Sequence, residues 1–456
     1  MIYATTRRGD LMQSRDEYYR TRRSTRWIYS TLPASIAMGP LSGVITLYIL
    51  QLGGTVIDVS YAIALASALA IPAAIFWGKV SDTFQKRKAQ IVVSYAGLAV
   101  LLVAFTLISS VSGIILTFGL YSFITAANAA PLNLLVMETS PRQRWQRSFS
   151  KLQYMSSLGS TIGLMIAVVI AVVLSLSELM LIFAAMAVAS IALTALLVYQ
   201  PKEMFRRVHF TRNLFAFMSR MFTSPVNVTK PVMILRTPSA HGLMRLRRRL
   251  SSPAGGYRTL TIIYYAIFLF SIGSGLFNTA YPAGLKEVGI SQSNVFLVLL
   301  VGSAVQVIAF YLLGASFGRS RSISTIRNSL VIRAASYMAI GIPFVFYSAT
   351  GAFLSGLILY PIAAGIAYAF YYATSNTLVF DSLKGPGRGS ALGAYTALMG
   401  IGTFIGSLIS GYTSFYVGYW FTFVAGGILI LLSAHVFTRL GRRHAQQQHT
   451  SLHSAP

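Results

Sequence analysis

The chain has 456 residues, of which 55% are hydrophobic and only 10% charged, and its formal net charge is +27. Soluble chains are normally about a quarter charged, so this composition excludes an ordinary soluble domain and indicates a membrane protein. With no Cys, no P-loop motif and no metal-type spacing of its six His, the sequence excludes thiolate chemistry and P-loop ATP hydrolysis and predicts neither a metal nor a cofactor.

Twelve apolar stretches follow one another along the chain, and each can cross a bilayer core of about 30 Å as a helix of about 20 residues. The first six are Trp27–Leu50, Val56–Phe76, Ala89–Ser110, Gly113–Met137, Met155–Leu174 and Leu179–Val198. The second six are Leu260–Leu285, Val295–Leu313, Leu330–Tyr347, Ala352–Leu378, Leu392–Tyr416 and Trp420–Phe437. The stretches are apolar all round, whereas barrel strands alternate. They therefore predict an all-α polytopic membrane protein with twelve transmembrane helices in two six-helix halves.

Positive charge occupies the two tails and every second gap between the apolar stretches. The other gaps hold one basic residue, Lys286. Loops rich in Lys and Arg stay in the cytoplasm, so we expect a protein of the cytoplasmic membrane with both termini inside. Because the bases recur at each inner loop instead of forming one patch, they indicate anionic lipid headgroups as a partner and not nucleic acid.

The same pattern divides the chain into five parts. They are a basic tail (1–26), an N-terminal half (27–200), a basic linker (201–256), a C-terminal half (257–438) and a second cytoplasmic tail (439–456). In the linker, apolar residues such as Met204 and Phe215 recur at helical spacing among Arg residues. This favours a basic amphipathic helix on the inner leaflet, and the alternative is a solvated linker without structure.

The two halves repeat the same polar and glycine positions. Three pairs stand 243 residues apart: Glu138 and Asp381, Gly159 and Gly402, and Gly163 and Gly406. Parallel repeats of this kind are a transporter architecture, with the substrate site at the interface between the repeats.

The gap after the second stretch carries a recognisable motif. It reads Gly78-Lys-Val-Ser-Asp82-Thr83-Phe-Gln85-Lys86-Arg87 and resembles the signature loop G-x-x-x-D-R-x-G-R-R of the major facilitator superfamily, with Thr83 and Gln85 as departures. The counterpart from Gly314 to Arg319 lacks the acid. The span count, the long middle loop and the repeat agree with that family over essentially the whole chain.

The resemblance implies a cytoplasmic latch between the halves. Asp82 would lie beneath the start of the eleventh span, near 389–392, where a helix dipole favours an anion, and Lys86 would pair with Glu138. The alternative is that Asp82 only offsets local positive charge. The implied gating residues are Gly78, Asp82, Lys86, Arg87, Glu138, Arg319, Asp381 and Arg388.

The resemblance also implies that spans 1, 4, 7 and 10 line a central cavity. The polar residues there are Ser42, Thr46, Tyr121, Thr125, Asn128, Tyr264, Ser271, Ser274, Asn278, Tyr281, Tyr368, Tyr372 and Asn376. These groups could contact a permeant or could simply form hydrogen bonds between helices. Asp58 stands near the outer mouth, where it could meet a permeant.

No carboxylate lies near the centre of any span, and Arg333, early in the ninth stretch, is expected to snorkel towards the interface. A buried charge needs a partner, so we expect a monomeric secondary transporter, not an enzyme, for a small neutral or amphipathic molecule with little proton coupling. The alternatives are a multidrug or lipid exporter working by proton antiport, and a membrane receptor or scaffold that transports nothing.

Overall fold

We describe a computed structural model of the chain, which covers residues 26–84, 86–140, 145–198, 256–316, 323–381 and 388–453. Every regular element in these ranges is helical, and twelve helical segments are long and apolar enough to cross a membrane. The prediction of an all-α polytopic protein is therefore confirmed. The N-terminal tail and the predicted amphipathic helix of the linker lie outside the described residues.

The N-terminal half contains six spans, two of which are interrupted. Its elements are η1 (Arg26–Ser30), α2 (Thr31–Met38), α3 (Leu41–Gln51), α4 (Val56–Phe84), α5 (Arg87–Leu107), α6 (Val111–Thr125), η2 (Ala126–Asn128), α7 (Ala129–Thr139), α8 (Trp145–Val173) and α9 (Leu176–Leu197). The first span breaks between α2 and α3 at Pro40, which has no N–H to donate to the carbonyl of Ile36. The fourth span passes through the 3-10 turn η2.

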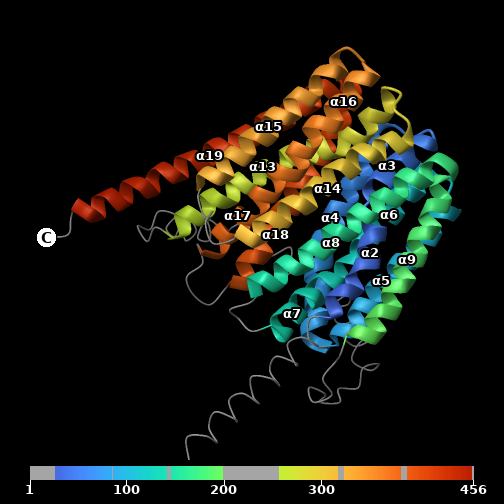
Figure 1. Cartoon of the computed structure of the whole chain (residues 1–456), viewed down its shortest axis with the longest axis horizontal. Helices are drawn as coiled ribbons and strands as arrows, with labels where there is room; N and C mark the ends of the chain where they lie inside the picture. Colours follow the sequence, from blue (N-terminus) through green and yellow to red (C-terminus); the bar gives the residue numbers. More distant parts are fainter. Residues whose placement is uncertain are drawn as a thin grey trace, which may run out of the picture.

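The C-terminal half repeats this plan. Its elements are α13 (Gly256–Glu287), α14 (Gln292–Ser316), α15 (Ile323–Val345), α16 (Ala349–Tyr360), η5 (Pro361–Ala367), α17 (Tyr368–Asp381), α18 (Arg388–Tyr416) and α19 (Tyr419–His453). Here the tenth span is interrupted by η5, a π-helical segment that begins at Pro361. The last helix, α19, projects beyond the bundle (Figure 1).

Most predicted span boundaries agree with the helices to within a few residues. Two differ more. The ninth helix begins at Ile323, seven residues before the predicted start at Leu330. A spanning helix can tolerate a few polar residues in its first turns. The last helix continues to His453, well past the predicted end at Phe437, and no Pro interrupts it there.

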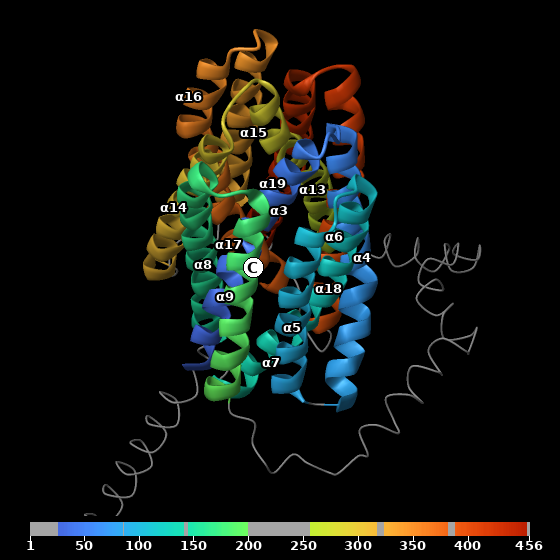
Figure 2. The same ribbon diagram turned by 90° about the vertical axis from the view of Figure 1, so that its right-hand side faces the viewer.

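The paired glycines show that the halves are built alike. A Cβ added to Gly159 would lie 2.6 Å from the Cβ of Ser35 on α2, and one added to Gly402 would lie 2.6 Å from the Cβ of Ser271 on α13. The small residues let α8 pack tightly on the first span and α18 on the seventh. The sequence repeat is therefore a repeat in packing. Figure 2 shows α8 beside α14, one of the places where the two halves meet.

The halves meet along two pairs of long helices, α4 with α18 and α8 with α14. We name the two ends of the bundle after residues: the Arg87 end, predicted to be cytoplasmic, and the Asp58 end, predicted to be outside. At the Asp58 end α3 also packs against α13, which brings the first and seventh spans together there.

Candidate functional site

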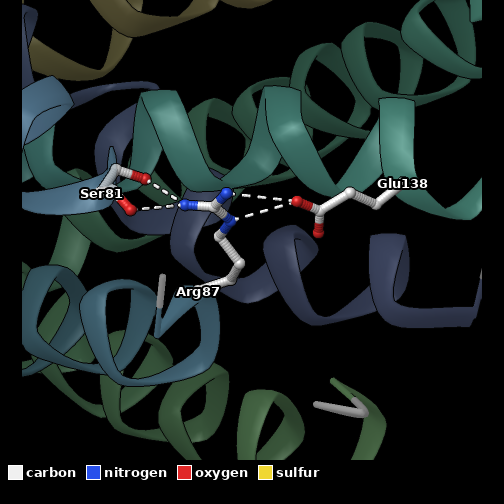
Figure 3. Close-up of polar contacts among 3 residues, drawn as sticks. All are labelled: Ser81, Arg87 and Glu138. Atoms are coloured by element: carbon white, nitrogen blue, oxygen red, sulfur yellow. Dashed lines mark hydrogen bonds and ion pairs between the residues drawn. The ribbon is translucent and has the colours of Figure 1, made fainter. Parts of the chain in front are cut away.

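An arginine at the Arg87 end joins three elements of the N-terminal half. The Arg87 guanidinium donates to the Ser81 carbonyl at 2.7 Å and to the Ser81 hydroxyl at 2.9 Å, both on α4. It also forms an ion pair of 3.2 Å with Glu138 near the end of α7 (Figure 3). Arg87 is the first residue of α5. One side chain therefore fixes the ends of the second, third and fourth spans relative to one another.

The ion pair adds a contact that the expected latch did not include. The family resemblance implied a link between Lys86 and Glu138, and the structure places Arg87 on that carboxylate. Lys86 occupies the N-cap position of α5, and its link to Glu138 stays a prediction.

The other expected gating residues are only partly described. Gly78 lies in the interior of α4, where an added Cβ would meet nothing within 4 Å. Asp82 lies on α4, Asp381 ends α17 and Arg388 begins α18, but their side chains lie outside the described residues, as does Arg319. The contact between Asp82 and the start of the eleventh span thus stays a prediction.

Contacts between the two halves include several at the Asp58 end. The hydroxyls of Tyr61 on α4 and Tyr412 on α18 form a short hydrogen bond, and Ser293 on α14 donates to the carbonyl of Val168 on α8 at 2.8 Å. Closer to the middle, the hydroxyls of Thr161 and Ser303 lie 2.7 Å apart. The halves are therefore tied together on this side by groups that can separate without leaving a buried charge.

The carboxylate at this end, Asp58, has a local role in the structure. It accepts hydrogen bonds from the backbone N–H of Thr55 at 2.7 Å and from the Thr55 hydroxyl at 2.9 Å. This arrangement satisfies a donor at the start of α4. Asp58 therefore stabilises a helix end.

The predicted polar stripe on the seventh span does not stay on one surface. Ser271 is 1% exposed and faces Gly402 of α18, whereas Tyr281 is buried and stacks on Tyr360 of α16 at 5.0 Å. Asn278 is exposed and Tyr264 is half-buried. The polar side chains of the seventh span cover a wide part of the surface of α13. Because α18 and α16 pack on either side of it, only some of these side chains can face one cavity.

In the first and fourth spans, two predicted cavity hydroxyls bond within their own helices. Thr46 donates to the Ser42 carbonyl at 2.9 Å, and Thr125 donates to the Tyr121 carbonyl at 2.8 Å. Ser42 itself is exposed, and Tyr121 and Asn128 are half-buried. These last three are the candidates that the N-terminal half presents with accessible surface.

The tenth span brings its tyrosines to an unexpected residue. Tyr368 and Tyr372 lie 5.7 Å apart between ring centroids, and the guanidinium of Arg333 lies over the Tyr368 ring at 5.1 Å. Arg333 is only 3% exposed. The expectation that it snorkels is wrong, because α15 begins seven residues earlier than predicted and Arg333 thus stands in its middle. The side chain of Asn376 lies outside the described residues.

The architecture and the motif agree with a direct comparison of the chain with known families. The family model of the Major Facilitator Superfamily matches residues 28–360 and 263–455. The chain belongs to the Major Facilitator Superfamily. It is thus a multi-pass membrane protein from a family of secondary transporters, as the signature loop and the repeat predicted. A comparison with curated protein sequences gave no significant match.

Solved structures of the superfamily share the fold of this chain. The nucleoside transporter NupG is 15% identical, with a TM-score of 0.60 over 92% of this chain and 98% of the other. A POT family transporter in complex with a thioalcohol conjugated peptide is 13% identical, with a TM-score of 0.66 over 92% and 96%. A POT family transporter in complex with 5-aminolevulinic acid is 12% identical, with a TM-score of 0.67 over 92% and 96%. At these identities the likeness shows the fold alone.

Proposed function

We propose that this protein of the Major Facilitator Superfamily moves a small neutral or amphipathic molecule across the cytoplasmic membrane by alternating access between its two halves. The observation that carries the proposal is the family match over both halves. The matched packing of Gly159 on α2 and Gly402 on α13 supports it, because two halves of similar rigidity can rock about a shared interface.

The arrangement described here would be the state that is closed on the outside. Tyr61 with Tyr412 and Ser293 with Val168 join the halves at the Asp58 end, which the alternation of basic loops predicts to face outwards. In the opposite state these bonds would break and the Asp82 latch would close the Arg87 end. Only a contact that can be broken lets the two states interconvert.

The candidate permeant contacts are neutral polar and aromatic side chains on four spans. Among those with accessible surface are Asn128, Tyr264, Asn278 and Tyr368. Amides and hydroxyls can satisfy the polar groups of a permeant, and the aromatic rings can cover its apolar part. The solved relatives named above transport nucleosides or bind a conjugated peptide and 5-aminolevulinic acid, so these classes are the first to test.

The test is counterflow in proteoliposomes that contain the purified chain. Nucleosides, dipeptides and 5-aminolevulinic acid are loaded one at a time, and uptake of the radiolabelled compound is measured with and without an imposed pH gradient. We expect saturable counterflow of at least one compound with little response to the gradient. Asn278→Ala should raise the half-saturating concentration, whereas the matched change Asn294→Ala, at the exposed start of α14, should not.

The outcomes separate the alternatives. Accumulation that requires the pH gradient would favour the proton antiporter over our proposal. If a folded protein shows no saturable flux of any compound in an expanded panel, the receptor or scaffold interpretation replaces transport.

A further inference from the structure

A permanent positive charge is buried in the middle of the C-terminal half. Arg333 lies ten residues from the start of α15 at Ile323 and twelve from its end at Val345, about 15 Å from one end and about 18 Å from the other at roughly 1.5 Å per residue. Its side chain is 3% exposed. Arginine stays protonated in proteins, so this position holds a cation in the middle of a membrane-spanning helix.

Among the described side chains of the C-terminal half, no carboxylate lies beside that cation. The sequence has no Asp or Glu from 204 to 286, from 288 to 380 or after Asp381. Glu287 at one end of the bundle accepts a hydrogen bond of 2.6 Å from Tyr419, and Asp381 ends α17 at the other. The two acids of the half therefore stand at opposite ends of their helices, while Arg333 lies between them. An unpaired buried charge is strongly unfavourable.

Aromatic rings surround the guanidinium without neutralising it. Its central carbon lies 5.3 Å from the ring centroid of Phe270, 5.1 Å from that of Tyr337 and 5.1 Å from that of Tyr368. Nη1 donates to the carbonyl of Ala363 at 3.2 Å. That carbonyl belongs to η5, and π-helical segments are frequent at functional sites. These contacts orient the cation but supply no negative charge.

Three buried polar atoms lie beside one another, and none of them forms a hydrogen bond of normal length and angle. They are Nε of Arg333, the hydroxyl oxygen of Tyr337 and Oγ of Ser274. Tyr337 neighbours both Arg333 and Ser274, and Ser274 stands one helical turn from Asn278, which is exposed. All three groups can donate a hydrogen bond, and a set of donors around a cation is the chemistry that binds an anion.

We propose that Arg333, Tyr337 and Ser274 form a binding site for one small anionic group within the C-terminal half. The group is a carboxylate or an ion of similar size such as chloride. It arrives either as a free ion or as the acid group of an amphipathic permeant that enters past Asn278. The permeant source rests on the proposed transport function, whereas binding of the free ion does not.

The test uses the purified full chain and measures its thermal unfolding midpoint. Sodium chloride, sodium formate or sodium butyrate is titrated at constant ionic strength against sodium HEPES, whose bulky anion should not enter. We expect a saturable rise of about 2–5 °C, as for a ligand that binds only the folded state. Arg333→Gln should abolish the rise without lowering the midpoint in HEPES, because the substitution removes an unpaired charge. The matched variant Arg327→Gln, on the exposed side of the same helix, should keep it.

Two further results complete the design. Tyr337→Phe keeps the ring over the guanidinium, so this variant should fold normally. Because it lacks the hydroxyl, the half-saturating formate concentration should rise roughly tenfold. If Arg333→Gln does not fold, this variant tests the site in its place. Saturation by chloride or formate but not by butyrate assigns a free ion, and saturation by butyrate but not by its methyl ester assigns the acid group of a permeant. A midpoint that does not respond to any of these anions, or an equal response in Arg333→Gln, overturns the site even if transport itself is confirmed.

Discussion

The glycine contacts that repeat between the halves lead to a sharp prediction about stability. A Cβ at Gly163 would overlap the carbonyl oxygen of Ile36, and one at Gly406 would overlap the carbonyl oxygen of Ile272. In both cases the carbonyl carbon would lie 3.0 Å away. The obstacle is backbone inside a helix, so it cannot rotate aside as a flexible side chain could. We therefore expect Gly163→Ala and Gly406→Ala each to separate a pair of helices.

The magnitude follows from two opposing terms. Overpacking costs about 1–3 kcal/mol, and replacing glycine by alanine within a helix returns up to about 1 kcal/mol. The net change should be a loss of about 1–2 kcal/mol, or a fall of roughly 2–5 °C in the unfolding midpoint of the purified protein. Gly78→Ala is the matched control, because its Cβ would meet nothing within 4 Å, and it should leave the midpoint unchanged or raise it by about 1–2 °C.

The comparison of the three variants decides the reasoning. If Gly163→Ala melts at the same temperature as Gly78→Ala, then α8 and α2 do not approach as closely as described. If Gly163→Ala is destabilised but Gly406→Ala is not, the two halves are not packed alike.

Three more predictions concern the ends of the bundle. Because the chain has no native Cys, a single Cys at Ser291 should react with an impermeant maleimide in whole cells and one at Ser251 should not; the reverse pattern would invert the orientation. Arg87→Ala should lower the free energy of unfolding by about 1–3 kcal/mol, since it removes the bonds to Ser81 as well as the ion pair. Glu138→Gln should lower it by under about 1 kcal/mol, because that carboxylate is 43% exposed. Equal losses of the two variants in chemical denaturation would contradict this prediction. Tyr61→Phe removes one hydrogen bond between the halves and should shift the population away from the state closed at the Asp58 end by about fivefold. Distance measurements across that end would detect this shift. An unchanged distance distribution would show that this bond does not hold the outer side closed.

Much of the architecture could be predicted from the sequence because it depends on lengths and spacings. About 20 apolar residues must form a helix to cross a membrane, since every backbone polar group has to be satisfied within the segment. The spacing of Gly159 and Gly163 recurs at Gly402 and Gly406 because the same close approach is needed twice. The signature loop pointed to the family for a related reason, since it places a fixed set of charges at one helix end.

Tertiary structure alone decided which neighbour each polar side chain meets. Helical spacing placed Ser271 and Tyr281 on one stripe, but α18 covers the first and the aromatic cluster around Tyr360 covers the second. The partner of Glu138 was likewise decided by the tertiary structure: Arg87 reaches this carboxylate because Arg87 is the first residue of α5. Arg333 shows the largest difference: its depth depends on where α15 begins, and its burial depends on rings from α13 and α17. Hydropathy sums the properties of neighbours in sequence, whereas the environment of a charge is set by neighbours in space.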